Sequence, residues 1–293
     1  MSKEQEYTKG FVTSHDGTTV GYRQMGSGPG LILLHGGISS SQYFMKLGTA
    51  LSDEFTVYIP DRRGRGLSGP FGDNYGLQRE VEDMDALLKE TGAHYVFGAS
   101  TGGLIALQSS ITLPDIHKIV SYETVVYVNK DEMDRFNDIV RRFDEELSKG
   151  KFTTAMVTSL DVYNKIDPEE KSSWLFHLPS LIWKPIFALI LEEDERRIKG
   201  DDVTLKALMP TLKLDVQLVN ETEGKLDNFK NVSAEVLLLG GGKSSIFLKN
   251  SLKTLDKLLP QGTCKVVEGL DHDSAQNYGK PEVIAQEIKS FLK

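Results

Sequence analysis

A serine flanked by two glycines offers the clearest chemistry in this sequence. The pentapeptide 98–102 (Gly-Ala-Ser-Thr-Gly) directly follows a β-type run at 94–97 and directly precedes a helix-like run at 104–107. This pattern is typical of a nucleophile elbow, a strained strand-to-helix turn that exposes the serine hydroxyl. The flanking residues must be glycine because side chains there would collide with the neighbouring strand and helix. The pattern therefore predicts Ser100 as a nucleophile for acyl transfer.

Acyl transfer by a serine also needs a base, an acid that orients the base, and backbone donors for the oxyanion. His272 follows the last strand-like run, 264–267, so it is expected on the same side of the sheet as Ser100 and is predicted as the base. We expect His35 to support its own loop structurally. The remaining histidines have no comparable placement: His15, His94, His117 and His177.

The oxyanion donors are expected to be backbone N–H groups. The N–H of Thr101, directly after the nucleophile, is predicted as one donor. The second is expected from the His35-Gly36-Gly37 loop, and we choose Gly37 over Gly36. The glycines indicate only that the backbone can approach a ligand closely there.

Strand-like and helix-like runs alternate along most of the chain. The apolar runs predict a parallel sheet buried by helices on both faces, with a hairpin across Asp16-Gly17 at one edge. Strands are predicted at 20–25, 31–34, 55–59, 94–97, 119–122, 236–239 and 264–267, and helices at 78–90, 246–259 and 281–292.

One long segment between two strands looks entirely helical. Its predicted helices are 132–147, 151–163, 169–176 and 184–199. Ligands of open α/β sheets bind beyond the carboxyl ends of the strands, where such an insertion is expected to lie. We therefore predict a core domain of 1–128 and 224–293 and a helical cap (lid) of 129–223. An appended lobe without a catalytic role is the alternative.

Several motifs, in order, resemble the α/β-hydrolase fold superfamily: the loop at 35–37, the stretch 61–68 (Asp-Arg-Arg-Gly-Arg-Gly-Leu-Ser), the pentapeptide and His272. The resemblance implies a mostly parallel central sheet of about eight strands with helices on both faces, plus an inserted helical cap. It also implies that 61–68 is a turn that fixes the sheet and the wall of the site, without a chemical role.

The acid departs from the pattern of most members, which place an Asp shortly after the penultimate strand. Here that segment, 240–245, reads Gly-Gly-Gly-Lys-Ser-Ser and holds no carboxylate. Glu123 is the best substitute, since zearalenone-type lactone hydrolases and one subgroup of haloalkane dehalogenases place a Glu after the corresponding strand. Asp271 and Asp273 are poorer candidates because neighbouring side chains rarely point at each other. Glu123 as a solvated loop residue remains the alternative.

Composition excludes several classes of protein. The chain of 293 residues is 39% hydrophobic and 26% charged, as in ordinary globular proteins, and its formal charge of −8 argues against nucleic acid as a partner. The apolar run 178–191 is too short to span a membrane. The N-terminus shows no apolar signal, so a cytoplasmic location is expected. The single cysteine, Cys264, is expected to be a buried strand residue.

These observations predict a serine esterase or lactonase that acts on a small, fairly apolar molecule through an acyl-enzyme, without metal or organic cofactor. A serine nucleophile argues against haloalkane or epoxide hydrolysis, which proceeds through a carboxylate. Cleavage of a carbon–carbon, thioester or amide bond, or perhydrolysis, remains open, as does a non-catalytic receptor or degenerate hydrolase. The sequence leaves monomer or homodimer undecided. Four aromatic residues are proposed as pocket walls or core: Trp174, Phe176, Trp183 and Phe187.

Overall fold

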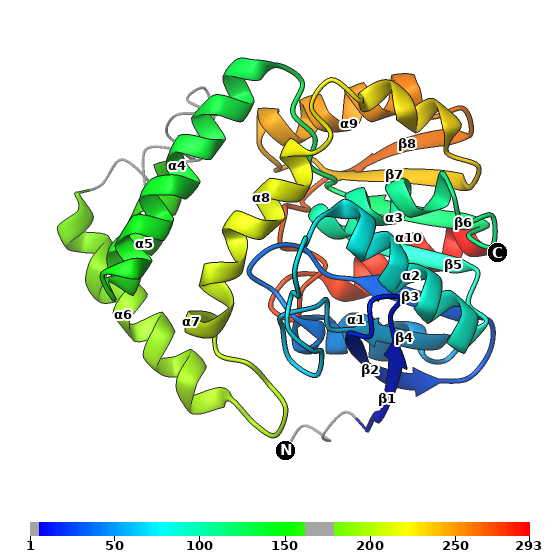
Figure 1. The fold of residues 1–293 in the computed structure, drawn as a ribbon, viewed down its shortest axis with the longest axis horizontal. Helices are drawn as coiled ribbons and strands as arrows, with labels where there is room; N and C mark the ends of the chain where they lie inside the picture. The colour runs from blue at the N-terminus through cyan, green and yellow to red at the C-terminus, as the bar shows by residue number, and fades with distance from the viewer. Residues whose placement is uncertain (1–5, 162–178) are drawn as a thin grey trace.

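The computed structural model describes residues 6–161 and 179–293 (Figure 1). Its strands are β1 (Thr8–Thr13), β2 (Thr19–Gly26), β3 (Gly30–Leu34), β4 (Thr56–Pro60), β5 (Tyr95–Ala99), β6 (Lys118–Tyr122), β7 (Glu235–Gly241) and β8 (Gly262–Val267). Its α-helices are α1 (Met45–Leu51), α2 (Leu77–Thr91), α3 (Thr101–Ser110), α4 (Lys130–Ser148), α5 (Phe152–Ser159), α6 (Ser180–Arg197), α7 (Leu205–Leu208), α8 (Leu212–Asn220), α9 (Ile246–Leu258) and α10 (Pro281–Leu292). Within these residues, no helix has the length and apolar character needed to cross a membrane.

The strands form one eight-stranded sheet in the order β1-β2-β4-β3-β5-β6-β7-β8. The pairs from β4 to β8 are all parallel, whereas β2 runs antiparallel to both β1 and β4. The hairpin predicted across Asp16-Gly17 is confirmed, and Gly17 takes a left-handed φ of 86° in its turn. Its first strand, β1, was absent from the predicted runs.

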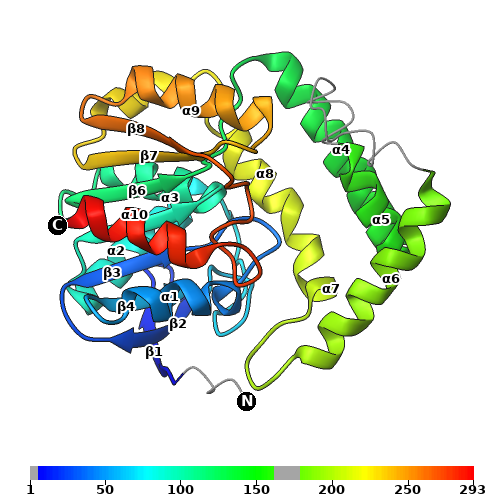
Figure 2. The ribbon, with the colours of Figure 1, turned by 180° about the vertical axis from the view of Figure 1, so that it is seen from behind.

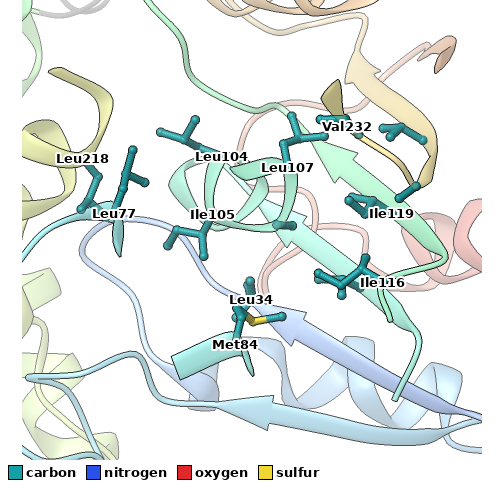
Figure 3. Packing of buried hydrophobic residues seen from close by; sticks show 14 of the residues in the cluster. Leu34, Leu77, Met84, Leu104, Ile105, Leu107, Ile116, Ile119, Leu218 and Val232 are labelled. Atoms are coloured by element: carbon teal, nitrogen blue, oxygen red, sulfur yellow. The ribbon is translucent and has the colours of Figure 1, made fainter. Parts of the chain in front are cut away.

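Helices cover both faces of the sheet, as the apolar strands require (Figures 1 and 2). On one face α2, α3 and α9 bury an apolar cluster in which Leu104 and Leu107 of α3 meet the β6 residue Ile119 (Figure 3). On the other face α1 and α10 bury a second cluster, which includes Leu47 and Ile288. The predicted α/β class is therefore confirmed.

The parallel strands bring their carboxyl ends to one edge of the sheet. Ala99 at the end of β5 pairs with Tyr122 at the end of β6, and Gly241 at the end of β7 pairs with Val267 at the end of β8. The residues that follow these strands therefore emerge together, as the sequence argument required.

Between β6 and β7 the described elements are all helical. Helices α4 and α6 match predicted helices, and α5 covers 152–159 of the predicted helix 151–163, whose last two residues lie outside the described residues. The predicted helix 169–176 also lies outside them. Helix α8 returns to the core, where its Leu218 lies beside Leu77 of α2 (Figure 3). The division into a core of 1–128 and 224–293 and a cap of 129–223 stays a prediction.

The expectation for Cys264 is wrong. This residue lies in β8, and its side chain is exposed. Strand β8 forms the edge of the sheet beside β7. An edge strand has a neighbour on one side only, so strand-like character did not guarantee burial there.

Candidate active site

Ser100 occupies a strained turn between β5 and α3. Its backbone φ is 56° and ψ is −123°, a conformation that non-glycine residues adopt rarely and that clusters at functional sites. A Cβ added at Gly98 would lie 2.4 Å from the carbonyl oxygen of Gly102, and one added at Gly102 would lie 2.4 Å from that of Leu34. Both contacts are with backbone, which cannot yield easily. The two glycines are therefore sterically required.

His272 faces a buried carboxylate. Its Nδ1 lies 3.6 Å from Oε2 of Glu123, whose side chain is 3% exposed, against 38% for the imidazole. Within the described part of the chain, neither of these two atoms has a hydrogen-bond partner. A small approach would satisfy both atoms at once, and catalytic hydrogen bonds are often long in unliganded enzymes. The structure thus brings together two residues that the sequence placed in one site.

The Glu123 carboxylate is fixed from the neighbouring strand. Its Oε1 accepts a hydrogen bond of 2.6 Å from the backbone N–H of Gly241, and its own N–H donates to the carbonyl oxygen of Leu239 at 3.0 Å. Glu123 takes a left-handed φ of 52°, a second strained position at the edge that holds Ser100. The glycine run that lacks a carboxylate therefore supplies an amide that orients one.

The two aspartates beside His272 have other partners. Oδ1 of Asp271 accepts a hydrogen bond of 2.7 Å from the hydroxyl of Ser274, and Oδ1 of Asp273 accepts one of 2.9 Å from the amide of Gln276. These contacts are local to the loop that carries His272. They favour Glu123 over either aspartate as the partner of the imidazole.

The pKa of His272 is raised above its ordinary value. Burial of the ring acts to lower this pKa, but the Glu123 carboxylate facing Nδ1 and the negative charges of Asp273 and Asp271 outweigh it. Carboxylates around the ring stabilise the imidazolium, the form in which a general base holds the proton that it has accepted.

His35 has the structural role that the sequence predicted. Its ring is fully buried, with Nδ1 donating to the carbonyl oxygen of Gly36 at 2.9 Å and Nε2 accepting from the backbone N–H of Arg62 at 3.2 Å. Burial and the charges of Arg65 and Arg62 hold its pKa well below the ordinary value, so the ring is neutral. This histidine joins the loop at 35–37 to the stretch 61–68.

The predicted oxyanion donors come from two segments, the start of α3 and the loop at 35–37. Thr101 is the first residue of α3, so its N–H has no acceptor within the helix. Gly36 and Gly37 line the same cavity as Ser100, and a Cβ at Gly36 would come within 2.8 Å of the Ser100 Cβ. The roles of Gly37 and Thr101 stay predictions.

The stretch 61–68 is a pinned turn. Asp61 accepts hydrogen bonds from the N–H groups of Ser41 at 2.7 Å and Leu67 at 2.9 Å. The three arginines of the stretch 61–68 are buried and bind carboxylates of the chain itself, so they do not form an anion site. Their ion pairs are Arg62 with Glu80 and Asp215, Arg63 with Asp83 and Asp16, and Arg65 with Asp215.

Ser100 and His272 line one cavity of about 350 Å³. Its apolar wall is formed by side chains from both the core and the helical insertion: Phe44, Val125, Phe136, Leu212, Phe247 and Leu248. Of the four proposed aromatic residues, Trp174 and Phe176 lie outside the described residues. Trp183 and Phe187 stack on each other along α6 at 5.7 Å, and Phe187 is buried, which matches the core alternative.

The sequence that forms these strands, the elbow and the loops matches a known protein family. The sequence profile of the family described as alpha/beta hydrolase fold matches residues 29–275. The chain belongs to the α/β hydrolase fold family. The residues that carried the resemblance, from the loop at 35–37 to His272, all fall within the matched region.

Relatives in this family span nearly the whole chain. The 2-(acetamidomethylene)succinate hydrolase of Mesorhizobium japonicum is 23% identical over 94% of this chain and 91% of its own length. An α/β hydrolase from Sphaerobacter thermophilus has a similar structure, with a TM-score of 0.74 and 24% identity over 97% of this chain and 100% of the other. An esterase from a Rhodococcus species has a TM-score of 0.66 and 20% identity over 97% and 98% of the two chains. These structures share the fold.

Proposed function

We propose that this chain is a serine hydrolase that cleaves an ester or lactone of a small, fairly apolar molecule through an acyl-enzyme. The observation that carries the proposal is the shared cavity of Ser100 and His272, with Nδ1 of His272 facing the buried Glu123. Membership of the α/β hydrolase fold family supports hydrolysis as the class of reaction.

The proposed mechanism follows from which nitrogen faces which partner. Since Nδ1 of His272 faces Glu123, Nε2 is the nitrogen that takes the proton of Ser100 as its oxygen attacks the carbonyl. The N–H groups of Gly37 and Thr101 bind the oxyanion, and His272 returns the proton to the leaving alcohol. A water molecule activated by His272 then hydrolyses the acyl-enzyme and releases the acid.

The helical insertion, 129–223, is proposed as the cap of this site. Phe136 of α4 and Leu212 of α8 line the cavity opposite the residues from the sheet edge. A volume of about 350 Å³ is at the small end of the range for ligand pockets, roughly 300–1,000 Å³, which favours a small substrate.

Covalent labelling tests this proposal directly. A fluorophosphonate probe is expected to label the wild-type protein at Ser100 and to fail with Ser100→Ala and His272→Ala. Hydrolysis of p-nitrophenyl butyrate should be lost in the same two variants. Absence of labelling at every pH would overturn the proposal in favour of a receptor or a degenerate hydrolase. Parallel thioester, amide and β-diketone substrates determine the type of bond.

Lys243 favours a second candidate, a substrate that carries a carboxylate. This lysine lines the cavity, and it is exposed to solvent. The Mesorhizobium relative acts, by its name, on a succinate derivative. If this candidate is right, p-nitrophenyl hemisuccinate will be preferred over p-nitrophenyl butyrate, and Lys243→Met will remove the preference. An unchanged preference in Lys243→Met would exclude it.

A further inference from the structure

The loop that carries Gly37 is strained and is held from outside the core. Ile38, directly after Gly37, has a φ of 46°, which is rare for a β-branched residue. A backbone of this kind persists only where its surroundings hold it. The Ile38 side chain packs against an apolar cluster of the helical insertion that includes Phe143, Leu191 and Met209. The insertion therefore holds this loop in place through its apolar contact with Ile38.

A second residue of the insertion, Asp215, lies close to the same loop. Asp215 of α8 is 1% exposed, and a Cβ added at Gly37 would lie 3.3 Å from its Oδ2. Oδ1 of Asp215 accepts a hydrogen bond of 3.1 Å from the hydroxyl of Thr101. One carboxylate thus lies beside Gly37 and accepts a hydrogen bond from the side chain of Thr101, the two residues that are proposed to supply the oxyanion donors.

Two arginines of the stretch 61–68 fix this carboxylate. Nη1 of Arg62 donates to Oδ1 of Asp215 at 2.6 Å, and Nη2 of Arg65 donates to Oδ2 at 2.6 Å. Nε of Arg62 also binds Glu80 at 3.0 Å, so the buried cluster holds two positive and two negative charges. Burial raises the pKa of Asp215, but the charges of Arg65 and Arg62 outweigh burial and keep the group ionised.

Helix α8 is itself seated on the core beside this cluster. The amide of Gln217 donates a hydrogen bond of 2.8 Å to the carbonyl oxygen of Tyr75, and Leu218 packs beside Leu77 (Figure 3). Asp215 is therefore held in place by its partners and by its own helix. A shift of α8 would move the carboxylate that lies between Gly37 and Thr101.

We propose that Asp215 is a positioning residue for the oxyanion hole, holding Gly37 and Thr101 at the spacing that the oxyanion requires. This inference rests on the proposed function. It means that the rate of the chemical step depends on the position of α8 in the helical insertion, because α8 carries Asp215. Because the oxyanion forms only as the carbonyl is attacked, a misplaced donor weakens transition-state binding more than substrate binding. The consequence is a change in kcat rather than in KM.

The test compares Asp215→Asn with Asp202→Asn, using p-nitrophenyl butyrate. Asp202 also joins the insertion to the core, through an ion pair of 2.7 Å with Arg23 of β2, and it does not contact Gly37 or Thr101. We expect Asp215→Asn to lower kcat by about 10- to 100-fold with little change in KM, a milder effect than deleting a donor outright. Asp202→Asn should retain kcat. Equal losses in the two variants would overturn the inference.

Thr101→Val decides the case if Asp215→Asn does not fold. Valine keeps the shape and the backbone N–H but removes the hydroxyl that donates a hydrogen bond to Asp215, so kcat should fall about 10-fold at unchanged KM. Where both single variants fold, the double variant should be no slower than Asp215→Asn alone, because both changes break one contact. Full kcat in Thr101→Val would overturn the inference. If the wild-type protein neither hydrolyses esters nor labels at Ser100, the proposed function itself has failed.

Discussion

The hydroxyl of Tyr122 donates a hydrogen bond to the backbone oxygen of Asp271, so the residue before Glu123 holds the residue before His272. Tyr122 is fully buried, and burial raises the pKa of its phenol, which keeps it protonated as a donor. Two consecutive residues at the end of β6 therefore face the loop of His272: Tyr122 binds the backbone of Asp271, and Glu123 lies beside the imidazole. In the proposed mechanism, this arrangement allows an acid that follows β6 to orient a base that follows β8.

Replacing Glu123 by glutamine tests the position of the acid. Glu123→Gln should lower kcat by about 10²- to 10⁴-fold, because the imidazolium loses the anion that orients and stabilises it. Asp271→Asn and Asp273→Asn serve as controls and should change kcat little, since both aspartates have partners within their own loop. Steady-state kinetics with p-nitrophenyl butyrate gives the comparison. If Asp273→Asn were as slow as Glu123→Gln, the assignment of the acid to Glu123 would be contradicted.

The raised pKa of His272 predicts the pH dependence. The base works only when neutral, so activity should rise with pH through the pKa of His272 and fall as pH drops below it. Because neighbouring carboxylates raise this pKa, the midpoint of kcat/KM should lie above about 6.5, the ordinary value for histidine. In Glu123→Gln the midpoint should move to lower pH, measured by NMR titration of the imidazole. A midpoint that does not respond to Glu123 would contradict the pairing.

Truncation of Phe136 tests the helical insertion as a cap. This ring lines the cavity from α4 and packs on Phe247, so Phe136→Ala should enlarge the space beside Ser100. We expect the ratio of kcat/KM for p-nitrophenyl octanoate over butyrate to rise several-fold. Phe152→Ala is the matched control, because Phe152 packs within the insertion and the cavity is lined by other residues. An unchanged ratio in Phe136→Ala would favour an appended lobe.

Arg63 is predicted to be a stability residue without a role in catalysis. Its guanidinium is fully buried, and Nε donates to Asp83 at 2.8 Å while Nη1 donates to Asp16 at 2.8 Å. Arg63→Ala leaves the Asp83 carboxylate buried and unpaired, and should lower the free energy of unfolding in urea by about 3–5 kcal/mol. Arg63→Met combined with Asp83→Leu should lose less. The exposed Arg141, as Arg141→Ala, should show little change.

Much of the sheet could be predicted because its strands are short apolar runs buried on both faces. Residues 31–34 are buried between α1 on one side and α2 and α3 on the other, so periodicity and flanking glycines were sufficient. Strand β1 is not among the predicted strands because Phe11 and Val12 are its only large apolar residues, and of these two only Val12 is buried. The burial predicted for Cys264 is wrong for a related reason. A strand-like sequence does not show whether the strand lies in the middle of the sheet or at its edge, and β8 lies at the edge.

The predicted site residues follow strand ends, and the common edge of a parallel sheet explains why they come together. Asp215 escaped prediction because its partners, Arg62 and Arg65, lie about 150 residues earlier, and because α8 is a short helix. One available signal was the cluster of three arginines in an apolar neighbourhood. Buried guanidinium groups need carboxylates, so the cluster required acidic partners elsewhere in the chain.

The backbone amide of Gly241 has a consequence for how this active site can vary. In the proposed arrangement the loop after β7 contributes only its main chain to the acid, through the N–H that Glu123 accepts. Its side chains at Lys243 and Ser244 line the cavity. Substitutions there would alter which molecules enter while leaving the catalytic carboxylate in place. In the proposed mechanism, selectivity and reactivity therefore depend on separate segments, and substitutions can change one without the other.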